Sequence, residues 1–361
     1  MDIEERIHLV VRNTDEIVTP DELRILLETT PKPKAYWGFE LSGLMHIGFG
    51  LVCGSKIRDM IDAGFDFVIF LADWHSWINN KLDGNMTNIR TCGEYFKQGF
   101  TALGIKPRSV KYIWASDIAK NLEYWEKVIR IAKGISLQRT WRALPIMGRE
   151  MGFKDVETAW MYYPCMQAAD IFHLDLDVAC AGLDQRKAHM VAREASGKLN
   201  RKKPICVHSH LIMGLQEPEK TEGEFDENTN INLQISSKMS KSKPGSCIFI
   251  HDTENEINRK IRAAYCPPKQ VLGNPVLELA RYTIFPNRDT LQVTRPTKYG
   301  GSETFETYGA IEEAYVTGKL HPLDLKNGVA ESLVAILKPA REYFQCHPQT
   351  LQKMMEMGIT R

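Results

Sequence analysis

The segment from Phe65 to Asp73, FDFVIFLAD, constrains the fold of this chain more than any other stretch. Its apolar residues run almost continuously, and such runs are typical of strands buried on both faces of a sheet. Strands that alternate with helices pair in parallel and are covered by helices on both faces. The sequence therefore predicts an α/β fold with a doubly wound parallel sheet, whose ligands bind at the carboxyl ends of the strands. Strand-like runs also occur at 34–40 and 110–116, helical periodicity near 45–63, 87–103 and 121–134, and a strand, tight turn and helix at 177–195.

The length of 361 residues and the change of pattern along the chain indicate more than one domain. Thr19–Glu22 is a capping-box sequence with proline at the first helical position, so it predicts a short helix near the N-terminus. Beyond residue 247 the strand pattern largely stops, and helical periodicity recurs after a second capping box at Thr253–Glu256. We expect an N-terminal helical segment at 1–30, the α/β domain at 31–235, a lysine-containing loop at 236–246 and a mostly helical C-terminal domain at 247–361.

Composition narrows the classes of partner and compartment. The chain has 46 basic and 45 acidic residues, so a nucleic-acid partner would be met by local patches and not by a global positive charge. The N-terminal stretch MDIEERIHLVVRN lacks the apolar core of a signal peptide, and the longest apolar run is too short to span a bilayer. Eight cysteines occur without any C-x-x-C spacing, which fits a reducing compartment. We expect a cytoplasmic protein with no membrane partner.

One cluster has the residue types of a metal site: Cys206, His208 and His210 in the sequence CVHSH. Its alternative interpretation is the end of a buried strand. We favour the strand, because no second ligand pair with matching spacing occurs in the sequence. No protein-bound metal is expected.

The stretch SSKMSKSKPG, residues 236–245, also has two interpretations. Serine, lysine, glycine and proline are typical of a flexible, solvated linker. The alternative is a loop whose lysines bind an anion. Composition alone favours the linker, so the choice depends on other motifs of the chain.

The turn after the predicted strand at 34–40 has features of an anion site. It reads GFELSGLMHIGFG from Gly38 to Gly50. Glycines such as Gly38 and Gly48 permit close approach of a ligand to the backbone, and a helix N-terminus donates free N–H groups to an anion. His46 in the first helical turn can donate a hydrogen bond to a phosphate, although a histidine there is more often structural. No G-x-x-x-x-G-K-[ST] motif occurs, which excludes a P-loop.

The motifs HIGF at 46–49 and KMSKS at 238–242 together resemble the HIGH and KMSKS signatures of class I aminoacyl-tRNA synthetases. The resemblance implies a Rossmann-like catalytic domain that binds ATP with Mg²⁺, and a mobile loop whose lysines grip the pyrophosphate. Phe49 departs from the signature, which has a second histidine there. Phenylalanine cannot donate a hydrogen bond, so backbone N–H groups, the lysines and magnesium must compensate. The implied catalytic residues are His46, Lys238 and Lys241, and the implied ATP-binding residues are Gly38, His46, Gly48, Asp184, Lys238 and Lys241.

The segments YWGFE, LADWH, YYPCMQAAD, GLDQRK, AYCPP, KYGG and LHPLDLKN extend the similarity over nearly the whole chain, to tyrosyl-tRNA synthetases of the archaeal and eukaryotic type. The resemblance implies that Tyr36 and Asp170 bind the phenol of L-tyrosine. The spacing of residues 163, 167 and 170 is consistent with a tyrosine site, because it places them on one face of a helix. The residues implied around the α-amino group are Tyr163, Gln167 and Gln185, with Glu40 nearby.

The resemblance also implies contacts with tRNA(Tyr). Arg142 and Arg186 match positions that bind its acceptor end. His321 by itself is better explained as a helix cap, and Asp184 has the alternative role of an N-cap for the helix after it. The anticodon-binding group, in which an aromatic ring stacks on a base and a carboxylate binds a base edge, is matched by Tyr299, His321 and Asp324.

The segment at about 125–162 interrupts the alternation of strands and helices and is rich in Leu, Trp and Met. The equivalent insertion of the family forms a two-fold interface, so the resemblance implies a homodimer. The alternative is an internal hairpin packed on its own domain. Two other functions stay open: a tryptophanyl-tRNA synthetase, against which Tyr36 and Asp170 argue, and a non-catalytic homologue that binds tRNA or tyrosine, against which the KMSKS lysines argue.

Overall fold

The computed structural model describes residues 1–148, 156–218 and 229–357. Its centre is a six-stranded sheet in the order β1-β6-β5-β2-β3-β4. Strands β2 to β6 are parallel to one another, and β1 pairs antiparallel with β6 at one edge. The predicted sheet of parallel strands is confirmed. The strands are β1 (Thr14–Val18), β2 (Lys34–Phe39), β3 (Asp66–Leu71), β4 (Lys111–Trp114), β5 (Val178–Gly182) and β6 (Ile205–Ser209).

Helices cover both faces of the sheet because its central strands are apolar on both sides. Along β2 and β3, Trp37 and Ile69 lie in one core cluster, whereas Tyr36 and Phe70 lie in a second one. The first cluster includes residues of α1, α2, α3 and α5, and the second includes residues of α6 to α10. These helices are α1 (Ile3–Val11), α2 (Pro20–Thr29), α3 (Gly54–Asp62), α4 (Asp73–Ile78), α5 (Met86–Ala102), α6 (Ala115–Ile118), α7 (Leu122–Gly134), α8 (Leu137–Ala143), α9 (Tyr163–His173) and α10 (Arg186–Ala195).

The N-terminal segment contains a strand that its sequence does not predict. Residues 1–30 form α1 and α2, and β1 lies between the two helices and extends the sheet. Asp2 caps α1 through a capping box with Glu5, and the Thr19 side chain accepts a hydrogen bond from the Glu22 N–H at the start of α2. The sequence of β1, TDEIV, gives a weak strand signal because it is short, acidic and mostly half-buried.

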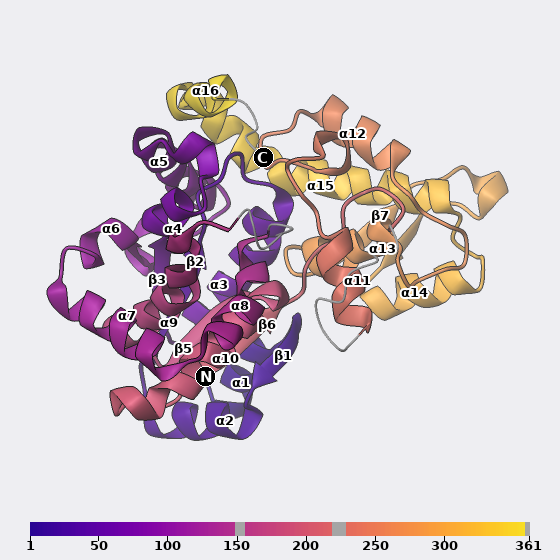
Figure 1. Ribbon diagram of the computed structural model, residues 1–361. Helices are drawn as coiled ribbons and strands as arrows, with labels where there is room; N and C mark the ends of the chain where they lie inside the picture. The colour runs from indigo at the N-terminus through magenta and orange to yellow at the C-terminus, as the bar shows by residue number, and fades with distance from the viewer. Residues whose placement is uncertain (149–155, 219–228, 358–361) are drawn as a thin grey trace.

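The C-terminal part of the chain is mostly helical, as predicted, and carries a small hairpin of β7 (Leu291–Val293) and β8 (Glu303–Phe305). Figure 1 shows this part beside the α/β domain, with the last helix returning to lie against α5. One apolar core cluster includes residues of both parts. The helices are α11 (Thr229–Ser237), α12 (Glu254–Ala263), α13 (Pro275–Leu279), α14 (Tyr308–Val316), α15 (Pro322–Cys346) and α16 (Pro348–Glu356).

Short helical turns connect these elements. No helix within the described ranges has the length and apolar character needed to cross a membrane. The π turns are η1 (Gly48–Cys53) and η10 (Ala280–Ile284), and the 3₁₀ turns are η2 (Lys81–Gly84), η3 (Pro107–Ser109), η4 (Leu144–Met147), η6 (Thr158–Tyr162), η7 (Leu183–Gln185), η8 (Ser196–Leu199), η9 (Pro244–Ser246) and η11 (Thr297–Tyr299).

Candidate active site

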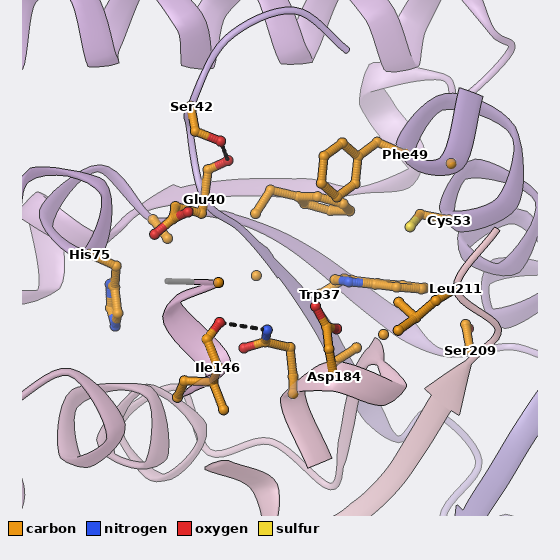
Figure 2. Close-up of a pocket in the computed structure, with 18 of the residues that line it drawn as sticks. Trp37, Glu40, Ser42, Phe49, Cys53, His75, Ile146, Asp184, Ser209 and Leu211 are labelled. Carbon is orange, nitrogen blue, oxygen red and sulfur yellow. Dashed lines mark hydrogen bonds between the residues drawn. The ribbon is translucent and has the colours of Figure 1, made fainter. Parts of the chain in front are cut away.

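A cavity of about 290 Å³ lies at the carboxyl ends of β2, β3, β5 and β6. This is where a doubly wound sheet is expected to bind its ligands. Its wall also includes residues of α9, η4 and the segment that contains Lys238. Figure 2 shows the arrangement, with His75 and Glu40 on one side of the cavity and Phe49 and Cys53 on the other.

One end of the cavity carries Tyr36 and Asp170. Both side chains are buried, and Asp170 is only 1% exposed. Burial raises the pKa of the Tyr36 hydroxyl well above its ordinary value, and the nearby Asp170 carboxylate raises it further. The Tyr124 hydroxyl donates to Asp170 Oδ1 at 2.9 Å, and His75 Nε2 lies 3.1 Å from Asp170 Oδ2. This end therefore presents a fixed hydrogen-bond acceptor next to a protonated hydroxyl.

The Glu40 carboxylate lies farther along the cavity. Its Oε1 accepts hydrogen bonds from the Tyr163 hydroxyl at 3.2 Å and from Asn79 Nδ2 at 2.5 Å. Lys81 Nζ is 3.6 Å from the other oxygen of Glu40. Burial and then the Glu40 carboxylate raise the pKa of Tyr163, so its hydroxyl stays a donor. These contacts orient the Glu40 carboxylate, which can bind a cationic amine.

Two glutamines complete this part of the wall. Gln167 Nε2 donates to Gln185 Oε1 at 3.4 Å, and Gln185 Nε2 donates to the Ile146 carbonyl at 3.0 Å. Gln167 Oε1 is buried and accepts no hydrogen bond from the described residues. A buried acceptor of this kind favours a ligand donor. The predicted group of Glu40, Tyr163, Gln167 and Gln185 is thus brought together.

His46 occupies the other end of the cavity, directly before η1. Its Nδ1 accepts a hydrogen bond from the Gly48 N–H at 3.1 Å, so the neutral ring carries its proton on Nε2. Burial and the positive charges of Lys241 and Lys238 lower the pKa of His46 to about 3. A Cβ on Gly48 would approach His46 Cε1 to 2.7 Å, which explains the glycine there. His46 is therefore a neutral hydrogen-bond donor at ordinary pH.

The segment with the KMSKS sequence is docked on the α/β domain. The Met239 N–H donates to the Ile212 carbonyl at 2.7 Å, and the Met239 side chain is buried. Lys238 Nζ donates to Asp184 Oδ2 at 2.6 Å, and Lys241 Nζ donates to Ser42 Oγ at 2.7 Å. Removal of the Lys241 ammonium from water lowers its pKa to about 8. These contacts argue against the interpretation of the segment as a free linker.

The structure tests the alternative role of Asp184 as a helix cap and shows how Phe49 packs. Asp184 lies in η7, and neither η7 nor α10 has a side-chain cap, so the N-cap interpretation of Asp184 is wrong. The Phe49 ring packs at 4.5 Å from the His46 ring and at 5.9 Å from both Phe39 and Phe96. Phenylalanine at this position thus joins the aromatic core under the turn, where a histidine would need a polar partner.

The residues compared with tRNA-binding positions lie outside this cavity. Arg142 is exposed on α8, and Arg186 Nε lies 2.9 Å from Glu16 Oε2. Tyr299 is 62% exposed. The His321 side chain accepts a hydrogen bond from the Leu323 N–H at 3.2 Å at the start of α15, so its role as a helix cap is confirmed.

Arg295 brings the Tyr299 turn and Asp324 together. Its Nε donates to the Gly301 carbonyl at 2.8 Å, two residues beyond Tyr299, and its Nη1 lies 4.0 Å from Asp324 Oδ2. The two segments are far apart in sequence, and the arginine holds them on one surface of the helical domain.

The CVHSH cluster forms the end of strand β6. His208 Nδ1 is 2.6 Å from Glu16 Oε2, and its Nε2 is 3.0 Å from His189 Nδ1. His210 Nδ1 is 3.0 Å from Asp15 Oδ2, and its Nε2 is 3.3 Å from Glu278 Oε2. Within 1–148, 156–218 and 229–357, no group of three or more His, Cys, Asp or Glu side chains could hold a metal ion. The interpretation as a buried strand end fits these contacts.

Sequence reasoning missed several polar residues beside the cavity, namely His75, Asn79, Lys81 and Tyr124. The signal for His75 and Asn79 is their spacing of four directly after the buried strand β3, which places both on one side of a helical turn. Tyr124 gives no local signal, because only the tertiary packing of α7 on α9 brings it to Asp170.

A family model described as tRNA synthetases class I (W and Y) matches residues 28–338. The chain is 47% identical over 379 residues to the tyrosine–tRNA ligase of Thermococcus sibiricus, and the alignment covers 100% of both chains. It superposes on the crystal structure of tyrosyl-tRNA synthetase from Pyrococcus horikoshii complexed with L-tyrosine with a TM-score of 0.90 and 43% identity, covering 99% of this chain and 100% of that one.

Tryptophanyl-tRNA synthetase from Aeropyrum pernix shares the fold at lower similarity. Its TM-score is 0.67 and its identity 16%, covering 95% of this chain and 85% of that one. The comparisons therefore favour the tyrosine-specific branch over the tryptophan-specific one. The chain belongs to the class I tRNA synthetases of the W and Y family, and within that family to the tyrosine–tRNA ligases.

Proposed function

We propose that the cavity binds L-tyrosine and ATP side by side and joins them as tyrosyl-adenylate, before the tyrosyl group passes to the 3′ end of tRNA(Tyr). One observation carries this proposal: a single cavity is lined both by Tyr36 with Asp170 and by His46 with Lys238. The first pair suits a phenol, and the second pair suits phosphates.

The proposed tyrosine site follows from the contacts of its donors and acceptors. The substrate phenol donates a hydrogen bond to the Asp170 carboxylate. The Tyr36 hydroxyl forms a hydrogen bond with the same phenol oxygen. Glu40, Tyr163, Gln167 and Gln185 surround the α-ammonium group, which needs acceptors and finds the Glu40 carboxylate and the unpaired Gln167 Oε1.

The chemical step requires no protein nucleophile. The tyrosine carboxylate attacks the α-phosphorus of ATP, a new C–O–P linkage forms, and the bond to pyrophosphate breaks. The protein contributes orientation and stabilisation of phosphate charge. His46 donates from Nε2, and Lys238 and Lys241 neutralise the departing pyrophosphate. Gly38 and Gly48 allow the nucleotide to approach the backbone, and Asp184 accepts from its ribose.

We propose that Mg²⁺ arrives with the ATP phosphates, where it shields charge during transfer. His46 and Lys238 line the cavity, and Lys241 is bonded to Ser42 of its wall; these side chains are donors and cations and so suit the phosphate oxygens themselves. Asp184 is the carboxylate in this group, and Lys238 is bonded to it.

In the second step the terminal ribose hydroxyl of tRNA attacks the acyl carbon and AMP leaves. We propose that Arg142 and Arg186 bind the acceptor end. Tyr299, His321 and Asp324 bind the anticodon, since an exposed aromatic ring can stack on a base and a carboxylate can bond a base edge.

We propose a homodimer formed through the insertion at about 125–162. Its described residues and those beside it expose large apolar side chains, and Leu122 and Leu137 are 82% and 70% exposed. Exposed large apolar side chains are enriched in protein interfaces. Sedimentation velocity should give a dimer that Leu137→Asp dissociates, and a wild-type monomer would contradict the proposal. The exposed large apolar residues in the described part of the insertion are Ile129, Leu137 and Tyr162, and Trp77 and Leu122 are exposed outside it.

Pyrophosphate exchange with each amino acid tests the proposed activity. We expect ATP–pyrophosphate exchange with L-tyrosine and only weak exchange with L-tryptophan or L-phenylalanine. Exchange that prefers L-tryptophan would support the tryptophanyl alternative. No exchange with any amino acid, in a protein that still binds tRNA or tyrosine, would support the non-catalytic alternative.

A further inference from the structure

The Asp170 carboxylate is held from two sides by side chains of other helices. The Tyr124 hydroxyl donates to Oδ1 from α7, and His75 of α4 places Nε2 near Oδ2. Tyr124 and His75 are only 1% and 2% exposed. The hydrogen bond from Tyr124 and the close approach of the His75 ring together restrict rotation of the carboxylate plane, so the oxygen that it offers to a ligand is restricted as well.

Tyr124 does not line the cavity, so it can act on a ligand only through Asp170. Its ring contacts the Trp125 ring and the His173 ring edge to face, and the centroid distance is 5.5 Å in both contacts. Burial and then the negative charge of Asp170 raise the pKa of Tyr124 well above its ordinary value, so the hydroxyl keeps its proton. The hydroxyl is therefore a permanent donor on a rigid ring.

His75 differs from Tyr124 because it lines the cavity itself. Its ring contacts Tyr163 edge to face at a centroid distance of 5.1 Å. Neither ring nitrogen makes a well-aligned hydrogen bond with any described residue, although both are buried. The aligned hydrogen bond to Asp170 is thus that of Tyr124. The His75 ring lies near the other carboxylate oxygen and restricts its movement.

We propose that Tyr124 is a positioning residue that orients the Asp170 carboxylate and so sets the preference for tyrosine over phenylalanine. This inference rests on the proposed role of Asp170 as the acceptor for the phenol. Without the Tyr124 hydroxyl the carboxylate loses its aligned donor and turns away from the phenol. Phenylalanine has no hydroxyl, so its activation does not depend on that orientation.

The test is the variant Tyr124→Phe, which removes one oxygen and keeps the ring. In pyrophosphate exchange, kcat/KM for L-tyrosine should fall about tenfold, the typical worth of a hydrogen bond to a charged group. The value for L-phenylalanine should change less than twofold, and the thermal unfolding temperature should stay close to that of the wild type. Titration calorimetry with L-tyrosine should show the same fold loss of affinity, because the bond is used before and during the reaction.

Tyr315→Phe is the matched control. Tyr315 is also fully buried, and its hydroxyl donates to the Pro267 carbonyl at 2.8 Å, but it lies in the helical domain. This control should leave the tyrosine-to-phenylalanine ratio unchanged.

A second variant, Asp170→Ala, separates the positioning role of Tyr124 from the proposed phenol site at Asp170. If Asp170→Ala reduces the ratio while Tyr124→Phe keeps it, the positioning role is overturned and the phenol site stands. If neither variant changes the ratio, the proposed phenol site itself fails. If Tyr124→Phe lowers activity with both amino acids equally, Tyr124 is a structural residue and the inference is also overturned.

Discussion

Lys238 Nζ lies 2.6 Å from Asp184 Oδ2, so the KMSKS segment is bonded to the turn that follows β5 at the wall of the cavity. Lys241 makes the second such contact, with Ser42 on the glycine-containing turn. Two elements almost 200 residues apart in sequence thus meet through charged and polar side chains over one cavity. The contacts explain how lysines from a segment of linker-like composition come to lie beside the proposed phosphate site.

The first prediction concerns Lys241. Replacement of Lys241 by Ala should slow single-turnover adenylation by roughly a hundredfold, since one donor to developing charge is lost. Tyrosine affinity should stay nearly unchanged, because the lysine acts at the phosphate end. Lys338→Ala, which removes an exposed lysine of α15, is the control and should have the wild-type rate. A normal rate in Lys241→Ala would return the segment to its linker interpretation.

The second prediction is a pH dependence from the same residue. Desolvation lowers the pKa of Lys241 to about 8, so its positive charge is lost as the pH rises through that value. The kcat/KM of adenylation for ATP should therefore fall above pH 8, since this parameter reports groups of the free enzyme. Lys241→Arg keeps its charge over this range and should flatten the fall. An identical alkaline limb in both proteins would show that another group titrates.

The third prediction concerns stability and His210. Burial alone would lower the pKa of His210, but its bonds to Asp15 and Glu278 outweigh burial and raise it to about 9. The ring also stacks on Tyr282 at 3.9 Å, between the α/β domain and the helical domain. A raised folded-state pKa gives stability that is complete below the unfolded value near 6.5 and is lost as the pH rises through 9.

Urea unfolding of His210→Gln tests this relation. The variant should be less stable than the wild type at pH 6, and the difference should shrink at pH 9.5. His347→Gln, which changes an exposed histidine, is the control and should show the same small difference at both pH values. A His210 difference that is independent of pH would mean that the imidazolium charge contributes nothing.

The fourth prediction separates the two domains. Tyr299→Ala and Asp324→Ala should each weaken aminoacylation of tRNA(Tyr) by about 1–3 kcal/mol, the usual worth of a stacked or specifically bonded base. Adenylation without tRNA should be unaffected, because both residues lie outside the cavity. Equal damage to both reactions would identify these residues as structural. His321→Ala should in addition lower the unfolding temperature, since His321 caps α15.

The sequence predicts the sheet and the glycine-containing turn because those features depend on local signals, whereas the assignment of Tyr36 and Asp170 to a tyrosine site depends on the family resemblance. The apolar run of β3 is set by burial on both faces, and the glycine-containing turn around His46 is set by backbone approach. The face of α9 that carries Tyr163, Gln167 and Asp170 follows from helical spacing alone.

Other features depend on contacts between distant segments and give no such signal. Strand β1 forms because it pairs with β6. The local sequence of Asp184 suggests a helix cap, but its side chain accepts a hydrogen bond from Lys238, more than 50 residues later. Tyr124 resembles any buried tyrosine until α7 packs on α9. Polar partners that meet only in the folded chain are the part of the site that sequence patterns leave undetermined.

The central claim is that Asp170 and Tyr36 select tyrosine by its hydroxyl, and the ratio of kcat/KM for L-tyrosine to that for L-phenylalanine in pyrophosphate exchange measures it most directly. The account predicts that Asp170→Ala lowers this ratio at least tenfold, as expected for loss of a charged, buried hydrogen-bond partner, and that Tyr36→Phe lowers it less. The loss should come from tyrosine, since phenylalanine never uses the bond. A wild-type ratio in both folded variants would contradict the account.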